Sequence, residues 1–446
     1  MKAHEAERQW PAAAALGLFA GGLLSCVLLE KSVLYALIFG YVIFFGYGLL
    51  QKHSVKDLLS MSLSGIQTVK HVLFTFLFIG MLTAAWRGSG TIAYLVSAAA
   101  RVIRPAIIVP ITFLLCCGIS LLTGTAFGAA ATAGVIAMAI GVAMGADKVL
   151  MGGAILAGAY FGDRCSPMST SALLVASLTK TDIYRNVRAM LKTALVPFLG
   201  SLCLYGILGA LRAPSDGAGV SEALFGNEYV LHWTCLLPAA LVIVLAACRL
   251  NVRLVMAAGA ASAGILCIFL QKMPPLAFVK MLVVGYQAAD PALAAMLDGG
   301  GILSMVNVAA IVCLSSSYAG LFQGTGLLSG LQGFLSRLTR GRTLYFSMLL
   351  TAVLTGLIAC NQTLTILLTH QLTGPMQADP SQAALDLEDS AVTVSPLVPW
   401  SIAGAVPLSL VSAGAGSLPY ALFLWLLPLW RLACGLLRKK ETTVSK

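Results

Sequence analysis

Long runs of apolar residues, separated by short polar stretches, recur along the whole chain. A helix needs about 20 apolar residues to cross the hydrocarbon core of a bilayer. The runs are continuous rather than alternating, which argues against the strands of a membrane barrel. The candidate spans lie at about 11–29, 32–50, 70–86, 105–122, 126–146, 149–162, 193–211, 229–248, 254–271, 302–322, 343–360, 397–413 and 418–434. The pattern predicts an all-α polytopic membrane protein with about 10–13 membrane segments, forming a single integral membrane domain over 1–446.

Three uncharged stretches, 105–146, 343–378 and 390–430, do not fit one span each. Each is interrupted by small or polar residues. Irregular backbone is tolerated at membrane depth only where protein or a watery cavity satisfies its polar groups. We therefore expect each stretch to hold two spans, or one span and a re-entrant segment. Broken helices of this kind are how secondary transporters build their sites.

Two parts of the chain present the same landmarks in the same order. At a constant offset, the first set recurs in the second: Gly88, Gly90, Arg101 and Arg104, then Gly324, Gly326, Arg337 and Arg340. Each set is followed by a Leu-Thr-Gly, an acidic residue and a Ser-Pro pair. Chance similarity between membrane segments is the alternative. Repeated halves are typical of secondary transporters, whose site lies at the repeat interface. We expect halves at about 70–212 and 300–436.

Composition supports a membrane protein and excludes other classes. Of 446 residues, 59% are hydrophobic and 10% are charged, whereas a soluble domain carries about 25% charged residues. This excludes a disordered chain, a secreted disulfide scaffold and an ordinary cytosolic enzyme. The net charge of +11 could suit nucleic acid. However, the basic residues are scattered between apolar runs, as in loops that set topology. We expect the lipid bilayer, and no nucleic acid, as a partner.

Several motifs are missing from the sequence. It has no GxxxxGK[ST] stretch, which excludes a P-loop ATPase within this chain. It has no HExxH or His-rich motif either, so we expect no enzyme and no cofactor. No cysteine pair has CxxC spacing, and we interpret the 11 cysteines as free thiols.

A basic cluster follows the last apolar run, at Arg438, Lys439 and Lys440. The positive-inside rule therefore predicts a cytoplasmic C-terminus in a multi-pass protein of the plasma membrane.

Asp163 is the most informative acidic residue. It lies between an uncharged run and a Ser/Pro-rich break, where an acid is costly unless it binds something. It is either a cation or proton ligand, or a loop acid paired with Arg164. Neutral oxygens for a hard cation follow it, at Ser166, Ser169 and Thr170. Alternatively, Ser166 is an N-cap with Pro167 at N1, and that helix N-terminus would also attract an anionic substrate.

A second acidic cluster has the same character and contains Glu388, Asp389, Ser390 and Ser395. Two adjacent carboxylates before a long uncharged run suggest binding, and a loop-end N-cap is the alternative. Asn361 lies in another uncharged stretch. Its amide either lines a path or ties helices together.

At these segments the chain resembles the NhaC-type sodium/proton antiporter family of the ion transporter superfamily. Residues 158–169, GAYFGDRCSPMS, are similar to that family's GAYFGDKMSPLS, and residues 387–400, LEDSAVTVSPLVPW, to its LEDSGTxxSPLxPW. Residues 123–128, TGTAFG, resemble its TGTSWG, which adds Thr123 and Thr125 to the candidate site. The likeness covers about residues 70–425. It implies an inverted-repeat transporter fold that exchanges sodium for protons; some relatives move organic acids or amino acids.

Two positions depart from the family pattern, because Thr170 and Asn361 stand where the family has aspartate. We predict a secondary active transporter that works by alternating access as a sodium/proton, or monovalent cation/proton, antiporter. Asp163, Glu388 and Asp389 would bind sodium or protons competitively, with sodium at Asp163 and Asp389. The neutral residues favour an alternative, a sodium- or proton-coupled carrier of a small amino acid or organic acid.

Overall fold

The computed structural model describes residues 14–22, 25–26, 33–102, 104–213, 228–248, 250–290, 294, 298–327, 344–359, 361–373, 377 and 379–444. Within these ranges the chain is helical and contains no β-strand, apart from an isolated bridge between Tyr286 and Gly299. The cysteines in these ranges are free thiols. The fold is therefore all-α, as the sequence predicts.

The first group of helices reaches residue 211. It consists of α2 (Val33–Leu50), α3 (Val55–Thr68), α4 (Lys70–Gly88), α5 (Thr91–Val102), α6 (Ile108–Thr123), α7 (Ala126–Ala129), α8 (Val135–Ala143), α9 (Lys148–Cys165), α10 (Thr170–Thr179) and α11 (Ile183–Leu211). A π-helical segment, Ala130–Gly134, joins α7 to α8. A 3-10 turn, Pro105–Ile107, leads into α6.

The remaining helices follow residue 228. They are α13 (Leu237–Ala247), α14 (Val252–Phe269), α15 (Pro275–Val284), α17 (Val306–Thr325), α19 (Leu344–Ala359), α20 (Gln362–Thr373), α21 (Pro380–Val394), α22 (Ile402–Leu410) and α23 (Leu422–Val444). Short 3-10 segments are η3 (Trp233–Leu236), η4 (Ile302–Met305), η6 (Ser395–Leu397) and η7 (Ala415–Tyr420).

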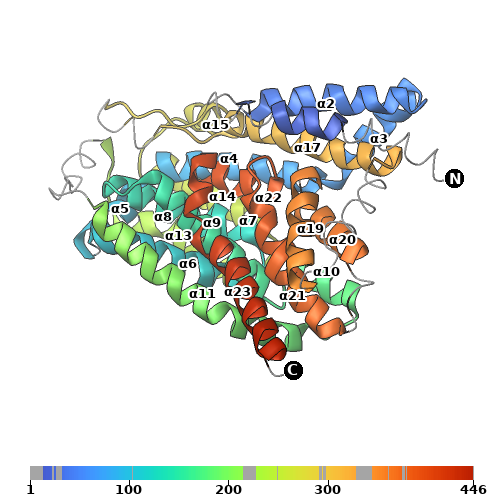
Figure 1. Ribbon diagram of the computed structural model, residues 1–446. Helices are drawn as coiled ribbons and strands as arrows, with labels where there is room; N and C mark the ends of the chain where they lie inside the picture. The colour runs from blue at the N-terminus through green and yellow to red at the C-terminus, as the bar shows by residue number, and fades with distance from the viewer. Residues whose placement is uncertain are drawn as a thin grey trace.

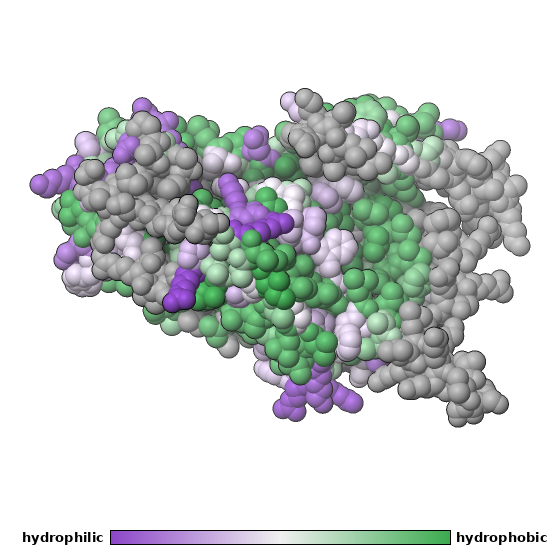
Figure 2. Space-filling view, turned by 60° about the vertical axis from the view of Figure 1, so that its left-hand side comes forward, coloured by the Kyte–Doolittle hydropathy of each residue, from purple (hydrophilic) through white to green (hydrophobic). Residues whose placement is uncertain are grey.

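By length and composition, four helical segments in the described ranges could cross a membrane: Pro105–Thr123, Ala126–Ala143, Ile183–Leu211 and Ile302–Phe322. The number rises to six if each of two bent helix pairs is one span. One such pair, Pro380–Leu397 with Ile402–Leu410, bends by 57° at the second Ser-Pro break. Further apolar helices are shorter, and broad apolar areas cover much of the face in Figure 2. The chain is a polytopic membrane protein with broken helices.

Helix α9 forms the centre of the molecule. Every residue from Leu150 to Cys165 is buried, and α6 packs along it. Gly158 and Gly162 make this approach possible, because a Cβ at Gly162 would lie 2.3 Å from the backbone nitrogen of Leu121. In Figure 1, α2, α3 and α17 pack together along the upper edge, while α11 and α23 run obliquely across the body below.

Two polar stretches between the predicted spans contain helices. Residues 51–70 contain α3, which begins with a capping box between Ser54 and Asp57. Residues 373–389 contain most of α21, which begins with Asp379 as N-cap and Pro380 at N1. Glu388 and Asp389 therefore lie inside a buried helix, and the interpretation of this pair as a loop-end N-cap is wrong.

The landmarks of the two predicted halves match in part. Gly90 and Gly326 follow α4 and α17 with φ of 76° and 65°, a conformation that glycine adopts without steric cost. Gly124 ends α6 with φ of 65°, whereas Gly356 lies inside α19. Arg337 and Arg340 fall outside the described residues, as does the side chain of Arg101. The division into halves at 70–212 and 300–436 stays a prediction.

Candidate functional site

The first Ser-Pro break separates α9 from α10. Ser166 keeps an extended backbone as the C-cap of α9, with φ of −93° and ψ of 132°. The next helix starts only at Thr170, where the Ser169 hydroxyl accepts hydrogen bonds from the backbone nitrogens of Ser171 and Ala172. The N-cap is therefore Ser169, and the expectation of Ser166 as N-cap with Pro167 at N1 is wrong.

The Asp163 carboxylate faces this break and is only 5% exposed. Its Oδ1 accepts a hydrogen bond from the Ser169 hydroxyl at 3.0 Å. Its Oδ2 accepts one from the Ser171 hydroxyl at 3.0 Å and one from the Gln362 amide at 3.4 Å. The backbone N–H of Ala126, at the start of α7, also binds it. Neutral donors and two helix N-termini, which carry partial positive charge, thus hold this carboxylate.

Arg164 makes a different set of contacts, although it is the next residue. Its fully buried guanidinium forms an ion pair with Asp389 of α21. It also donates to the backbone oxygen of Met190 at 3.1 Å and to the hydroxyl of Thr193 at 2.9 Å. Successive residues of a helix point about 100° apart, so Asp163 and Arg164 reach different neighbours. The expectation that Asp163 is a loop acid paired with Arg164 is wrong.

Asp389 is also engaged by a second arginine. Arg431 of α23 places its Nε 2.7 Å from Asp389 Oδ2 and its Nη2 2.6 Å from Asp386 Oδ1. Its guanidinium carbon lies 5.4 Å from the centre of the Tyr345 ring. These contacts join α9, α21 and α23 through charged groups. The sequence interpretation missed Arg431 and Asp386, although each is a charge next to a long apolar run.

Glu388 differs from its neighbours because no hydrogen bond or salt bridge holds its carboxylate in the described part of the chain. Its side chain is fully buried, and neither carboxylate oxygen has a hydrogen-bond partner within the described ranges. It lies close enough to Asp163, Arg164 and Asp389 to interact with them electrostatically.

Charge counting across this cluster identifies what is left uncompensated. Four carboxylates, those of Asp163, Asp386, Glu388 and Asp389, face two guanidinium groups, those of Arg164 and Arg431, giving a formal charge of 2 − 4 = −2. The arginines pair with Asp389 and Asp386. The two remaining negative charges belong to Asp163 and Glu388.

Several hydroxyl groups predicted from the sequence bind backbone atoms instead of facing the carboxylates. Ser166 donates to Leu121 at 2.9 Å, Ser390 to Asp386 at 2.6 Å and Thr123 to Ile119 at 2.9 Å. Thr125 caps α7 by accepting from Gly128 at 2.9 Å. Ser395 lies 3.5 Å from the hydroxyl of Ser401.

Two further predicted residues lie at helix starts. Thr170 is exposed at the first position of α10. The Asn361 amide oxygen accepts a hydrogen bond from the backbone of Leu364 at 2.8 Å, at the beginning of α20. The structure therefore brings together Asp163, Ser169, Glu388 and Asp389, and adds Ser171 and Gln362. Ser171 belongs to the hydroxyl cluster after the first Ser-Pro pair, and Gln362 to the Asn-Gln-Thr break, so both had a signal in the sequence.

In the described part of the chain, no group of three or more His, Cys, Asp or Glu side chains is arranged to hold a metal ion. A cation at Asp163 would therefore need oxygens of hydroxyl, amide or backbone groups as well. Such hard oxygen ligands are present in Ser169, Ser171 and Gln362.

Comparison with known proteins identifies the family. A family model described as the Na+/H+ antiporter family matches residues 8–179 and 158–436. The chain belongs to the Na+/H+ antiporter family. The resemblance stated from the sequence is thereby confirmed, and the protein is a secondary active transporter that works as an antiporter, in a family of transporters rather than of enzymes.

Relatives in this family are named for different transport functions. The chain is 28% identical over 423 residues to the malate-2H+/Na+-lactate antiporter of Bacillus subtilis, covering 92% of this chain and 90% of the relative. It is 27% identical over 397 residues to the Na+/H+ antiporter NhaC of Alkalihalophilus pseudofirmus, covering 86% and 85%. It is also 27% identical over 369 residues to the arginine/ornithine antiporter ArcD of Halobacterium salinarum, covering 78% and 75%.

Proposed function

We propose that this antiporter exchanges sodium for protons at the buried carboxylates of Asp163 and Glu388, by alternating access. One observation carries the proposal: Glu388 is fully buried beside Asp163 and has no hydrogen-bond partner in the described ranges. A buried carboxylate without a partner is too costly to stay ionised. It must take up a proton or a cation.

Competition between the two cations follows from electrostatic repulsion. Asp163 and Glu388 interact electrostatically, and like charges in a buried site repel each other more strongly than they would in water. Asp163 and Glu388 therefore do not both stay ionised without a cation. A sodium ion beside them neutralises the charge and displaces a proton, and a proton displaces the sodium ion. Because the two carboxylates do not bind sodium and a full set of protons together, each turnover exchanges sodium for protons.

We place the sodium ion with Asp163 and Glu388 rather than with Asp389. Both oxygens of Asp389 already face guanidinium groups, those of Arg164 and Arg431. The hydroxyls of Ser169 and Ser171 already face Asp163. They would supply neutral oxygens once they turn their protons away. The ion pairs of Arg164 and Arg431 then hold α9, α21 and α23 together around the site.

Flux measurements in proteoliposomes with an internal pH dye test the proposal. Sodium, lithium and potassium gradients are applied to wild-type protein, then to Asp163→Asn. We expect sodium-driven proton movement in wild type and its loss in Asp163→Asn, because the substitution keeps the shape and removes the charge. The matched control is Asp182→Asn, which changes an exposed N-cap to another good N-cap. Normal exchange by well-folded Asp163→Asn would overturn the proposal.

A second candidate function is coupled transport of a small organic acid. The name of the Bacillus subtilis relative includes malate and lactate, and a cationic cavity distant from Asp163 gives this candidate a physical basis. The same proteoliposomes, challenged with amino acids and organic acids, distinguish it from simple cation/proton exchange.

A further inference from the structure

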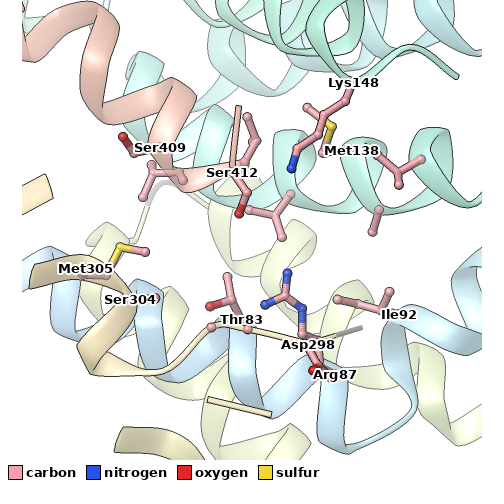
Figure 3. Close-up of a pocket in the computed structure, with 17 residues that line it drawn as sticks. Thr83, Arg87, Ile92, Met138, Lys148, Asp298, Ser304, Met305, Ser409 and Ser412 are labelled. Carbon is pink, nitrogen blue, oxygen red and sulfur yellow. The ribbon is translucent and has the colours of Figure 1, made fainter. Parts of the chain in front are cut away.

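A cavity of about 240 Å³ lies at the end of α9 opposite Asp163. It is bounded by one side of α8, by the ends of α4 and α22, by the starts of α5 and α9, and by the segment 298–305. Figure 3 shows its lining side chains. Lys148 and Asp163 are 15 residues apart on one helix, so about 22 Å of helix separates the cavity from the carboxylate pair. The cavity is not part of the cation site.

Two cationic side chains reach this cavity from different elements. Arg87 comes from the last turn of α4 and Lys148 from the first turn of α9, and their nitrogen atoms point toward the same space (Figure 3). The Nε of Arg87 is buried and has no hydrogen-bond partner within the described ranges. Lys148 is exposed and stands at the mouth of the cavity.

The backbone beside Arg87 is shaped to admit the guanidinium. Gly299 has φ of 122°, and a Cβ there would lie 2.9 Å from Arg87 Nη1. Asp298 is the one acidic residue in the lining, and it interacts electrostatically with Arg87. Its Oδ1 already accepts a hydrogen bond from the backbone nitrogen of Ala288 at 2.7 Å. Two cations and one carboxylate give the lining a formal charge of 2 − 1 = +1.

The rest of the lining combines hydroxyl groups with apolar side chains. The hydroxyls belong to Thr83, Ser304, Ser409 and Ser412, and the apolar wall includes Ile92, Val135, Met138 and Val142. Hydroxyls can bind the polar substituents of a small solute, while the apolar wall suits a short carbon skeleton. An inorganic anion would leave that wall in contact with water.

We propose that this cavity binds a small organic carboxylate, with its carboxylate group on Arg87 and Lys148. Arginine recognises carboxylates through paired hydrogen bonds of fixed geometry. The volume is below the range of sites for drug-sized ligands, which fits an acid of few carbon atoms. The inference does not depend on sodium/proton exchange at Asp163 and Glu388, because the two sites use different residues at opposite ends of α9.

Isothermal titration calorimetry on the purified protein, with lactate, malate and inorganic phosphate as probes, tests the site. We expect saturable binding of at least one carboxylate, and weaker binding of phosphate. Arg87→Gln and Lys148→Gln should each weaken carboxylate binding by about tenfold or more, since each removes a charged hydrogen-bond donor. Lys280→Gln is the matched control, because it removes one positive charge from an exposed position on α15 outside the cavity.

Two of the variants separate binding in the cavity from loss of folding and from loss of cation exchange. Lys148 is exposed, so Lys148→Gln keeps the test available if Arg87→Gln does not fold. Asp163→Asn should bind the carboxylate as wild type does, even when it has lost cation exchange. The proposal is overturned if neither carboxylate binds, if phosphate binds more tightly, if Lys148→Gln binds as wild type does, or if Asp163→Asn abolishes binding.

Discussion

Arg164 at the end of α9 and Asp389 in α21 form an ion pair in which both side chains are fully buried. The two residues are 225 positions apart in the sequence, and each precedes one of the two Ser-Pro breaks. The pair therefore fixes the position of one break relative to the other. It also leaves Asp163 and Glu388 as the carboxylates that the arginines do not neutralise.

Breaking this ion pair from one side should strongly destabilise the protein. Asp389→Asn leaves the buried Arg164 without its carboxylate partner, which costs about 3–5 kcal/mol. Arg164→Gln should cost less, because Arg431 still pairs with Asp389. The double variant should lose less than the sum of the two, because both members of the ion pair are removed together. Thermal unfolding in detergent measures all three proteins. Arg212→Gln, which breaks the exposed pair with Asp147, is the control and should unfold nearly as wild type does. Single variants as stable as this control would contradict the structural role.

Glu388→Gln should abolish sodium-driven proton movement without unfolding the protein. The glutamine keeps the size of the side chain and cannot carry a transported proton. We expect sodium-driven proton flux to fall to background while the protein stays folded, since a neutral group is less costly than a charge at this buried position. The pH dye assay in proteoliposomes measures the flux. If Glu388→Gln exchanges at the wild-type rate, Glu388 is not a carrier of the proton.

Substitutions at the neighbours Ser171 and Thr170 should differ in their effect on sodium affinity. The Ser171 hydroxyl donates to Asp163 at 3.0 Å, whereas Thr170 is exposed. Groups that orient a metal-binding carboxylate contribute about 10–100-fold to metal affinity, so Ser171→Ala should weaken sodium affinity by about tenfold or more. Thr170→Ala should leave it unchanged, and so should Thr170→Asp, although aspartate is the family's residue there. The sodium concentration for half-maximal exchange measures both effects. A tighter sodium affinity in Thr170→Asp would place that side chain in the site after all.

Gly162 should resist substitution because α6 lies against it. A Cβ at this position would approach the Leu121 backbone nitrogen to 2.3 Å. Gly162→Ala must therefore push α6 from α9 beside Asp163, at a cost of about 1–3 kcal/mol. Gly118→Ala on α6 is the matched control, since a Cβ there meets nothing within 4 Å. Thermal unfolding compares the two, and equal melting temperatures would disprove the close packing.

The topology prediction depends on Arg438, Lys439 and Lys440 after the last apolar run. By the positive-inside rule, a reporter fused after Lys446 should be active if it needs the cytoplasm and inactive if it needs export. Paired fusions with one reporter of each kind measure this directly. Activity of the exported type would invert the topology.

The sequence alone was sufficient to predict the class of fold and the family. Apolar runs specify where helices form, and most predicted spans correspond to helices, as at 105–122 for α6 and 302–322 for η4 and α17. Proline and small polar residues disturb a helix locally, so the Ser166-Pro167 and Ser395-Pro396 breaks were also predictable. Asp163 was singled out because an acid beside such a break is costly.

Only the tertiary structure decided which charges compensate one another. Adjacent residues such as Asp163 and Arg164 have the same local sequence, yet they point to different helices, and the partner of Arg164 lies in α21. The isolation of Glu388 depends in the same way on two arginines from α9 and α23 that pair with its neighbours. Hydrophobic periodicity reports which segments are apolar, but it carries no information on contacts between distant segments. The pairing of buried charges, and the cavity that holds Arg87 and Lys148, arise only when those segments pack together.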